Sequence, residues 1–201
     1  MEHGPSAERY CDKDPFVMKY ADHLLELFPA SKFVLMVRDG RASVHSMITA
    51  GVTITNFDLS DPRQCLSRWN QAGEEKCLIV HYEQLVLHTE PEMRRVLEFL
   101  DLEWNDNVLH HEDFVGEKIK LSSAEKSSDQ VVRPVNEDSL YKWTNFYSAD
   151  VINDMSLIAP MLAKLGYDPT ANPPNYGTPD DNPTLQAEEL IELHPSESLD
   201  L

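Results

Sequence analysis

The chain has 201 residues, of which 41% are hydrophobic and 26% charged, and its 17 Lys and Arg face 35 Asp and Glu for a formal net charge of -18. This composition is typical of a globular protein, and so acidic a chain is a poor general partner for nucleic acid, because phosphate contacts need clustered cations. Its longest apolar run, residues 33–37, is too short for a membrane-spanning helix or a signal-peptide core, and its three cysteines exclude a fully paired disulfide scaffold.

A helix, a strand and a second helix are predicted first along the chain. An Asp-Pro pair at 14–15 supplies an N-cap acceptor and a first-turn proline, apolar residues follow at helical spacing, and Pro29 ends this helix. The run 32–37 (KFVLMV) is too short for a helix and almost wholly apolar, so it predicts a buried strand of a parallel sheet. Residues 38–40 then form a turn, and 41–49 predict a helix.

A second strand and further helices are predicted in the rest of the chain. Residues 77–81 (CLIVH) have the character of another buried strand. A helix is expected to begin at Pro91, and a short one over 104–112. The longest helix is predicted over 148–165, with a kink at Pro160. The core face expected for the Pro91 helix comprises Met93, Val96, Leu97 and Leu100.

The composition divides the chain into three parts. Residues 168–201 carry eight acidic residues, no Lys or Arg, and six of the thirteen prolines, which predicts an extended, mostly disordered tail. The domain proper is predicted over 10–167, after an N-terminal lead of residues 1–9. Two strands are too few for a stable open sheet. We therefore expect either further strands within 50–70 and 115–135 or completion of the sheet by something outside this sequence.

The segment around Arg38 carries the clearest chemistry. The first predicted strand delivers Arg38 to its carboxyl end, and a helix begins directly afterwards. Ligands bind at the carboxyl ends of strands in open α/β sheets, a helix N-terminus attracts anions, and arginine adds a planar fork suited to phosphate. Ser46 on the same helix can add a hydroxyl. The alternative left open is a surface turn in which Arg38 and Arg41 are simply solvated.

The motif VRDGRASVHSM at 37–47 resembles the 3′-phosphate-binding segment of the protein-tyrosine sulfotransferases. The resemblance covers about residues 5–178 and lies in that family's C-terminal two-thirds. It implies an α/β, P-loop-like sulfotransferase fold and transfer of a sulfuryl group, without a metal, from the nucleotide PAPS to tyrosine hydroxyls in the Golgi lumen. The other motifs that carry it, in order, are CDKDPF (11–16), LIVHYEQLVLH (78–88), VLHHE (108–112), SSDQVVRPVN (127–136) and APMLAKLGYDPTANPPNYG (159–177).

The resemblance assigns a donor site. Arg38 and Ser46 are implied to hold the 3′-phosphate, Tyr82 to lie against the nucleotide, and Lys142 to add a cation beside it. The family has a further arginine four positions after the serine, where this chain has Ala50. The loop implied to close over the donor consists of Ser127, Ser128, Asp129, Gln130, Val131, Val132, Arg133, Pro134, Val135 and Asn136.

Lys13 and Ser127 are implied to be the catalytic residues. Sulfuryl transfer resembles phosphoryl transfer, so an ammonium and a hydroxyl can stabilise charge on the bridging and equatorial oxygens. Without the resemblance, Lys13 has the character of an exposed lysine and Ser127 that of an ordinary turn residue. No metal is expected at 110–112 (HHE), because adjacent histidines point in different directions and lack a nearby third ligand.

Several family features have no counterpart in this sequence. These are the 5′-phosphosulfate loop, the general-base glutamate that follows it, and the membrane anchor. We therefore expect an N-terminally truncated domain with an incomplete sheet, inactive by itself. The alternative is a non-catalytic nucleotide-binding or interaction remnant of the fold. The resemblance also implies that all three cysteines lack their family partners: Cys11, Cys65 and Cys77.

The partners follow from the same resemblance. Substrates would be proteins with tyrosines near acidic residues, which requires a local basic patch; the candidates for it are Lys118, Lys120 and Arg133. The resemblance further implies a homodimer located in the Golgi. Neither nucleic acid nor a metal is expected to bind, and PAPS is the expected co-substrate.

Overall fold

A computed structural model describes residues 8–13, 17–49, 77–117, 119 and 131–177. They fall into two compact units: the first takes in the described residues up to Phe33 together with Cys77, and the second takes in the described residues of 34–49 and 78–177.

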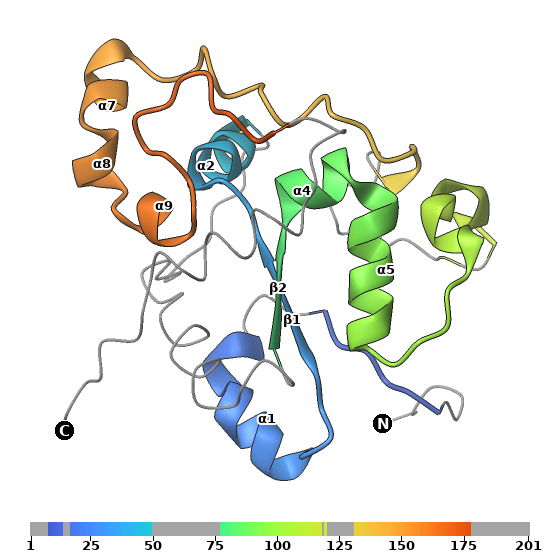
Figure 1. Cartoon of the computed structure of the whole chain (residues 1–201). Coiled ribbons are helices and arrows are strands. Elements are labelled where there is room, and N and C mark those ends of the chain that lie inside the picture. Colours follow the sequence, from blue (N-terminus) through green and yellow to red (C-terminus); the bar gives the residue numbers. More distant parts are fainter. Residues whose placement is uncertain (1–7, 14–16, 50–76, 118, 120–130, 178–201) are drawn as a thin grey trace. The chain divides into compact units, whose positions relative to one another are not determined.

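The first unit contains the predicted N-terminal helix. A 3-10 turn, Val17–Tyr20, leads into α1, Ala21–Leu27, drawn in blue in Figure 1. The Phe28 N–H closes the helix on the carbonyl of Leu24 at 2.7 Å. The helix ends two residues before Pro29, because the helical conformation is unfavourable for a residue that directly precedes a proline. The predicted Asp-Pro start lies outside the described residues.

The second unit is built on two neighbouring strands. β1, Phe33–Val37, and β2, Cys77–His81, form a two-stranded parallel sheet. Only the first residue of each strand, Phe33 or Cys77, is assigned to the first unit. Both predicted strands are confirmed, so the structure is of the mixed α/β class. The prediction that β1 is a buried strand is wrong within the described structure, because the Met36 side chain remains 50% exposed.

Additional strands were expected in two places. Residues 50–70 lie outside the described residues. Within 115–135, the described part shows an isolated bridge between Val115 and Ile119 and no named strand.

A helix follows each strand at its carboxyl end, directly after β2 and after two residues in the case of β1 (Figure 1). α2, Gly40–Thr49, follows β1 and confirms the helix predicted there. α4, Tyr82–Leu87, follows β2 and was not predicted, because six residues are too few to show a helical period. The two strand ends are therefore flanked by two helix starts.

The predictions for the middle helices need correction. α5, Thr89–Phe99, begins two residues before Pro91, which the first turn tolerates because its amides have no intrahelical partner. The predicted core-face residues of α5 are half-buried, and its buried residue is Glu92. The helix expected over 104–112 is replaced by two 3-10 turns, Asp106–Leu109 and His111–Phe114.

The single long helix predicted over 148–165 is wrong. The chain forms three short helices instead: α7, Ala149–Asn153; α8, Met155–Ile158; and α9, Met161–Lys164. Pro160 lacks an amide hydrogen and stands at the N-cap of α9, so it separates two helices rather than kinking one.

The core of the second unit is a cluster of buried apolar side chains near the sheet. Residues 168–177, assigned to the tail by composition, contribute Tyr176 to it, at 6% exposure. The packed chain thus extends beyond residue 167. Among the described residues, no helix is both long and apolar enough to cross a membrane. The buried members of the core are Val37, Leu87, Leu140, Met155, Leu162, Tyr167 and Tyr176.

Candidate functional site

Two consecutive residue pairs meet where the strands end. Arg38 and Asp39 follow β1, and Tyr82 and Glu83 follow β2. The backbone N–H of Asp39 donates to Oε1 of Glu83 at 2.9 Å, and the Arg38 guanidinium carbon lies 4.5 Å from the centroid of the Tyr82 ring. The structure therefore brings together two of the residues predicted to bind the donor, Arg38 and Tyr82.

Ser139 connects both of these side chains to the segment that precedes α7. Its carbonyl accepts a hydrogen bond from Nη2 of Arg38 at 3.2 Å, and its hydroxyl lies 2.8 Å from the Tyr82 hydroxyl. A guanidinium has five N–H donors. One of those on Arg38 is paired with the Ser139 carbonyl. Sequence reasoning missed Ser139, which has no motif around it.

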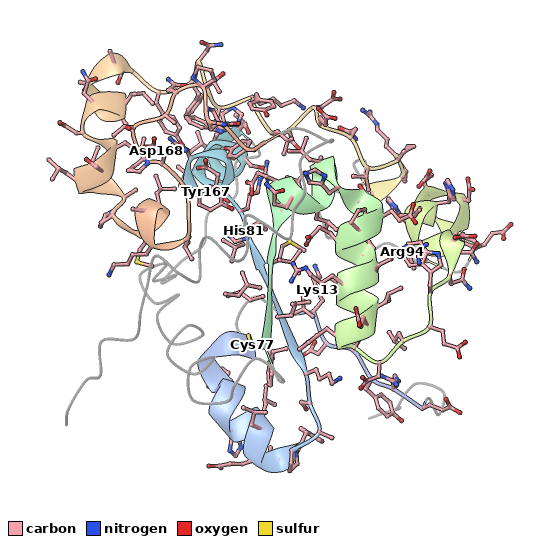
Figure 2. The ribbon with its side chains drawn as sticks, viewed as in Figure 1. Lys13, Cys77, His81, Arg94, Tyr167 and Asp168 are labelled. Carbon is pink, nitrogen blue, oxygen red and sulfur yellow. The ribbon has the colours of Figure 1, made fainter. Side chains whose placement is uncertain are left out.

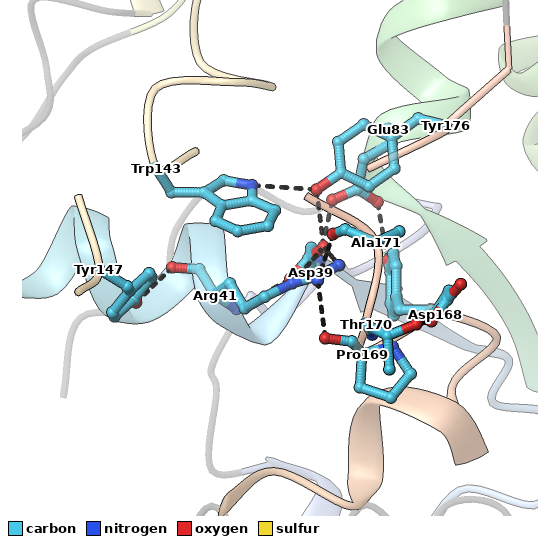
Figure 3. Close-up of polar contacts among 11 residues, drawn as sticks. Asp39, Arg41, Glu83, Trp143, Tyr147, Asp168, Pro169, Thr170, Ala171 and Tyr176 are labelled. Atoms are coloured by element: carbon cyan, nitrogen blue, oxygen red, sulfur yellow. Dashed lines mark hydrogen bonds and ion pairs between the residues drawn. The ribbon is translucent and has the colours of Figure 1, made fainter. Parts of the chain in front are cut away.

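Beside Arg38 lies a buried charged pair (Figure 3). Asp39 and Arg41 are 0% and 3% exposed, and Nη2 of Arg41 donates to Oδ2 of Asp39 at 2.7 Å. The Arg41 guanidinium also stacks over Trp143 at 4.2 Å from the ring and donates to the carbonyl of Ala171 at 2.9 Å. The solvated-turn interpretation is therefore wrong for Arg41, which is a structural residue.

Two buried tyrosines complete this network. The hydroxyl of Tyr176 donates to Oδ2 of Asp39 at 2.6 Å, and that of Tyr167 donates to Oε2 of Glu83 at 2.7 Å. Burial, reinforced by the neighbouring carboxylates, raises the pKa of both phenols above the ordinary value. Both therefore stay protonated and act as donors. Figure 2 shows Tyr167 beside His81, whose ring centroid lies 5.7 Å away.

Three further residues predicted for the donor site or for catalysis are described. Ser46 is half-buried on α2, and among the described residues its hydroxyl is not hydrogen-bonded to Arg38 or Tyr82. Lys142 is exposed. Lys13 is exposed in the first unit.

The predicted donor loop is described in its second half. Residues 131–136 are mostly exposed, and the Asn136 amide donates to the carbonyl of Pro134 at 3.0 Å. Residues 127–130, with the predicted catalytic Ser127, lie outside the described residues, as does Cys65. Cys11 is exposed and Cys77 is buried at the start of β2. Within the described ranges, no three His, Cys, Asp or Glu side chains gather as metal ligands.

Comparison with known proteins gives consistent matches. Residues 1–106 match the sequence model described as the sulfotransferase family. Protein-tyrosine sulfotransferase A of Caenorhabditis elegans is 55% identical, over 96% of this chain and 53% of that protein. Protein-tyrosine sulfotransferase 1 of Homo sapiens is 54% identical, over 90% and 52% respectively. A putative protein-tyrosine sulfotransferase of Caenorhabditis briggsae is 35% identical, over 87% and 66%. The chain thus spans about half the length of the first two relatives.

Proposed function

The chain belongs to the sulfotransferase family, and on that premise we propose that it supplies the 3′-phosphate end of a PAPS site for the sulfation of protein tyrosines. Relatives named protein-tyrosine sulfotransferases match it over most of its length, which supports the choice of acceptor. The reaction class is transfer of a sulfuryl group to a phenol.

The observation that carries this proposal is the placement of Arg38. It stands at the carboxyl end of β1, two residues before α2 begins, with its guanidinium 4.5 Å from the Tyr82 ring. Arginine at a helix start suits a phosphate through both charge and planar hydrogen bonding. An aromatic ring beside it suits a purine nucleotide by stacking. The pair therefore fits a nucleotide that carries a phosphate on its ribose.

The remaining donor contacts are proposed around this pair. Ser46 would add a hydroxyl to the phosphate and Lys142 a cation. The loop 127–136 would close over the nucleotide. Lys13 and Ser127 would stabilise the transition state, in which the sulfur–oxygen bond to the 5′-phosphate breaks as the bond to the tyrosine oxygen forms. The phenol proton must leave to a base, and the printed sequence has no counterpart of the family's glutamate.

A polypeptide of residues 1–201 alone is accordingly expected to bind the bisphosphate product, PAP, without catalysing transfer. Non-catalytic nucleotide binding is thus the second candidate function. It is supported by the pairing of Arg38 with the Tyr82 ring at 4.5 Å, which suits nucleotide binding and requires no transfer step. For the whole enzyme we propose acidic tyrosine-containing protein substrates, a homodimer, and a Golgi location.

Calorimetric titration of the 201-residue chain with PAP tests the proposed donor site. We expect binding that weakens about tenfold or more in Arg38→Met, because a charge-assisted bidentate contact is lost. Arg94→Met is the matched control, since Arg94 is exposed, pairs with Glu90 and stacks on Trp104. Equal affinity in all three proteins, or no binding at all, would overturn the donor site.

A transfer assay separates the two candidate functions. The chain is incubated with PAPS and an acidic peptide that contains one tyrosine, and sulfate on the peptide is followed by mass spectrometry. PAP binding without transfer supports the non-catalytic role for residues 1–201. Sustained turnover would show that the expected inactivity is wrong.

A further inference from the structure

We propose that Glu83 is a positioning residue, which holds the end of β1 so that Arg38 faces the ring of Tyr82. This inference rests on the proposed function, because the consequence of the positioning is selectivity for a nucleotide with a 3′-phosphate. Glu83 itself is not proposed to touch the nucleotide.

The geometry places Glu83 between the two strand ends. Its Oε1 accepts from the backbone N–H of Asp39 at 2.9 Å. Asp39 is the residue after Arg38, and Glu83 is the residue after Tyr82. One hydrogen bond therefore ties the neighbour of the phosphate-binding arginine to the neighbour of the nucleotide-stacking tyrosine. A shift of either strand end would break this bond and move the Arg38 guanidinium from the ring.

The second oxygen of Glu83 has a hydrogen-bond partner of its own. Oε2 accepts from the Tyr167 hydroxyl at 2.7 Å, and the residue is only 2% exposed. A buried carboxylate needs hydrogen bonds on both oxygens, because an unpaired buried polar group is costly. Tyr167 thus satisfies the second oxygen, while the first oxygen by itself ties Glu83 to the backbone at Asp39.

Charge alone gives no reason for a carboxylate here. A negative group close to a phosphate site opposes anion binding. The presence of Glu83 beside Arg38 and Tyr82 is therefore explained by the position of its oxygen rather than by its charge. The two effects can be separated, because glutamine keeps the position and loses the charge, whereas aspartate keeps the charge and withdraws the oxygen by one methylene.

The test compares the affinities of the 201-residue chain for PAP and for 5′-AMP, which lacks the 3′-phosphate. Calorimetry gives both dissociation constants, and their ratio isolates the 3′-phosphate contact. We expect Glu83→Asp to lower this selectivity about tenfold and Glu83→Gln to leave it within about threefold of wild type or raise it. Tyr167→Phe is the matched control: it removes a hydrogen bond from the same carboxylate but leaves the bond to Asp39, and selectivity should persist.

The outcomes distinguish the inference from the proposed function. Absence of selectivity in the wild type, or its retention in Arg38→Met, overturns both. Selectivity that depends on Arg38 but survives Glu83→Asp overturns the positioning role alone, as does an equal loss in Glu83→Asp and Tyr167→Phe, which would reflect general destabilisation. If circular dichroism shows Glu83→Asp to be unfolded, Glu83→Gln decides: retained selectivity supports the inference, and lost selectivity overturns it.

Discussion

The hydroxyl of Tyr176 donates a 2.6 Å hydrogen bond to Oδ2 of Asp39, a residue 137 positions earlier in the chain. The same hydroxyl accepts from Nε1 of Trp143 at 3.1 Å, and the Tyr176 carbonyl accepts from the Gln84 amide at 2.8 Å. Tyr176 therefore joins the end of β1, the start of α4 and the segment before α7, and it closes the polar network under the candidate donor site.

Tyr176→Phe should lower the free energy of unfolding by roughly 1.5–3 kcal/mol, the usual worth of a hydrogen bond to a charged group. The substitution removes only the hydroxyl and leaves the ring in the core. Urea denaturation at neutral pH measures the change. Tyr10→Phe is the control, because Tyr10 is 84% exposed and its substitution should change stability by no more than about 0.5 kcal/mol. Equal effects would contradict the structural role of Tyr176.

Stability should fall at alkaline pH because of Tyr167. Burial and the neighbouring Glu83 raise the pKa of this phenol above the ordinary value of 10.0. Its stabilising contribution is complete below the unfolded-state pKa and is lost as pH rises from about 10 toward the folded-state pKa. The expected slope is at most about 1.4 kcal/mol per pH unit. Urea denaturation between pH 8 and pH 11 (roughly spanning the ordinary tyrosine pKa) measures the free energy of unfolding. Its decline with pH should be shallower in Tyr167→Phe than in the wild type, and parallel declines would refute this.

Ser139→Ala should weaken PAP binding a few-fold and lower stability by about 1 kcal/mol, because the hydroxyl bond to Tyr82 is lost while the carbonyl bond to Arg38 stays. Tyr82→Phe removes the same hydroxyl pair from the other side. A double-mutant cycle of the two substitutions measures their coupling. The combined effect on stability should be smaller than the sum of the single effects, and strict additivity would argue against the Ser139–Tyr82 bond.

Asp168 should titrate below its usual range. The Thr170 hydroxyl and N–H both donate to Oδ1 of Asp168, at 2.7 and 2.8 Å, and they lower the pKa of this carboxyl below 3.8. Its contribution to stability is present above the unfolded-state pKa and is lost as pH falls through the lower folded-state pKa. Thr170→Ala should raise the pKa of Asp168 in an NMR titration. Thr144→Ala should not, because its hydroxyl bonds to the Tyr141 carbonyl.

Local pattern was sufficient for the elements that build the sheet edge. Each strand is a short apolar run, and only two residues separate β1 from α2, so both strands and α2 were predicted within a residue of their observed bounds. The region 148–165 was mispredicted because its apolar residues keep a helical spacing across Pro160, where the chain cannot continue a helix. Periodicity reports which face is apolar, but it does not report where hydrogen bonding stops.

The site was only partly predictable for a different reason. Arg38 was identified because its place after a strand and before a helix is visible in the sequence, and Tyr82 because of the family resemblance. Glu83 and Ser139 act through contacts with residues 44 and 101 positions away. No spacing rule connects residues so distant. Their roles depend on tertiary structure, which places them against Asp39 and Arg38.

The Arg41 guanidinium donates hydrogen bonds to the carbonyls of Pro169 and Ala171, which lie 128 and 130 residues later in the chain. A ribosome therefore releases Asp39 and Arg41 long before it makes the groups that enclose them. Until then, this ion pair remains in water, and the carboxyl edge of the sheet cannot reach its final form. The second unit is thus expected to mature after translation of its last packed segment, rather than progressively as the chain emerges.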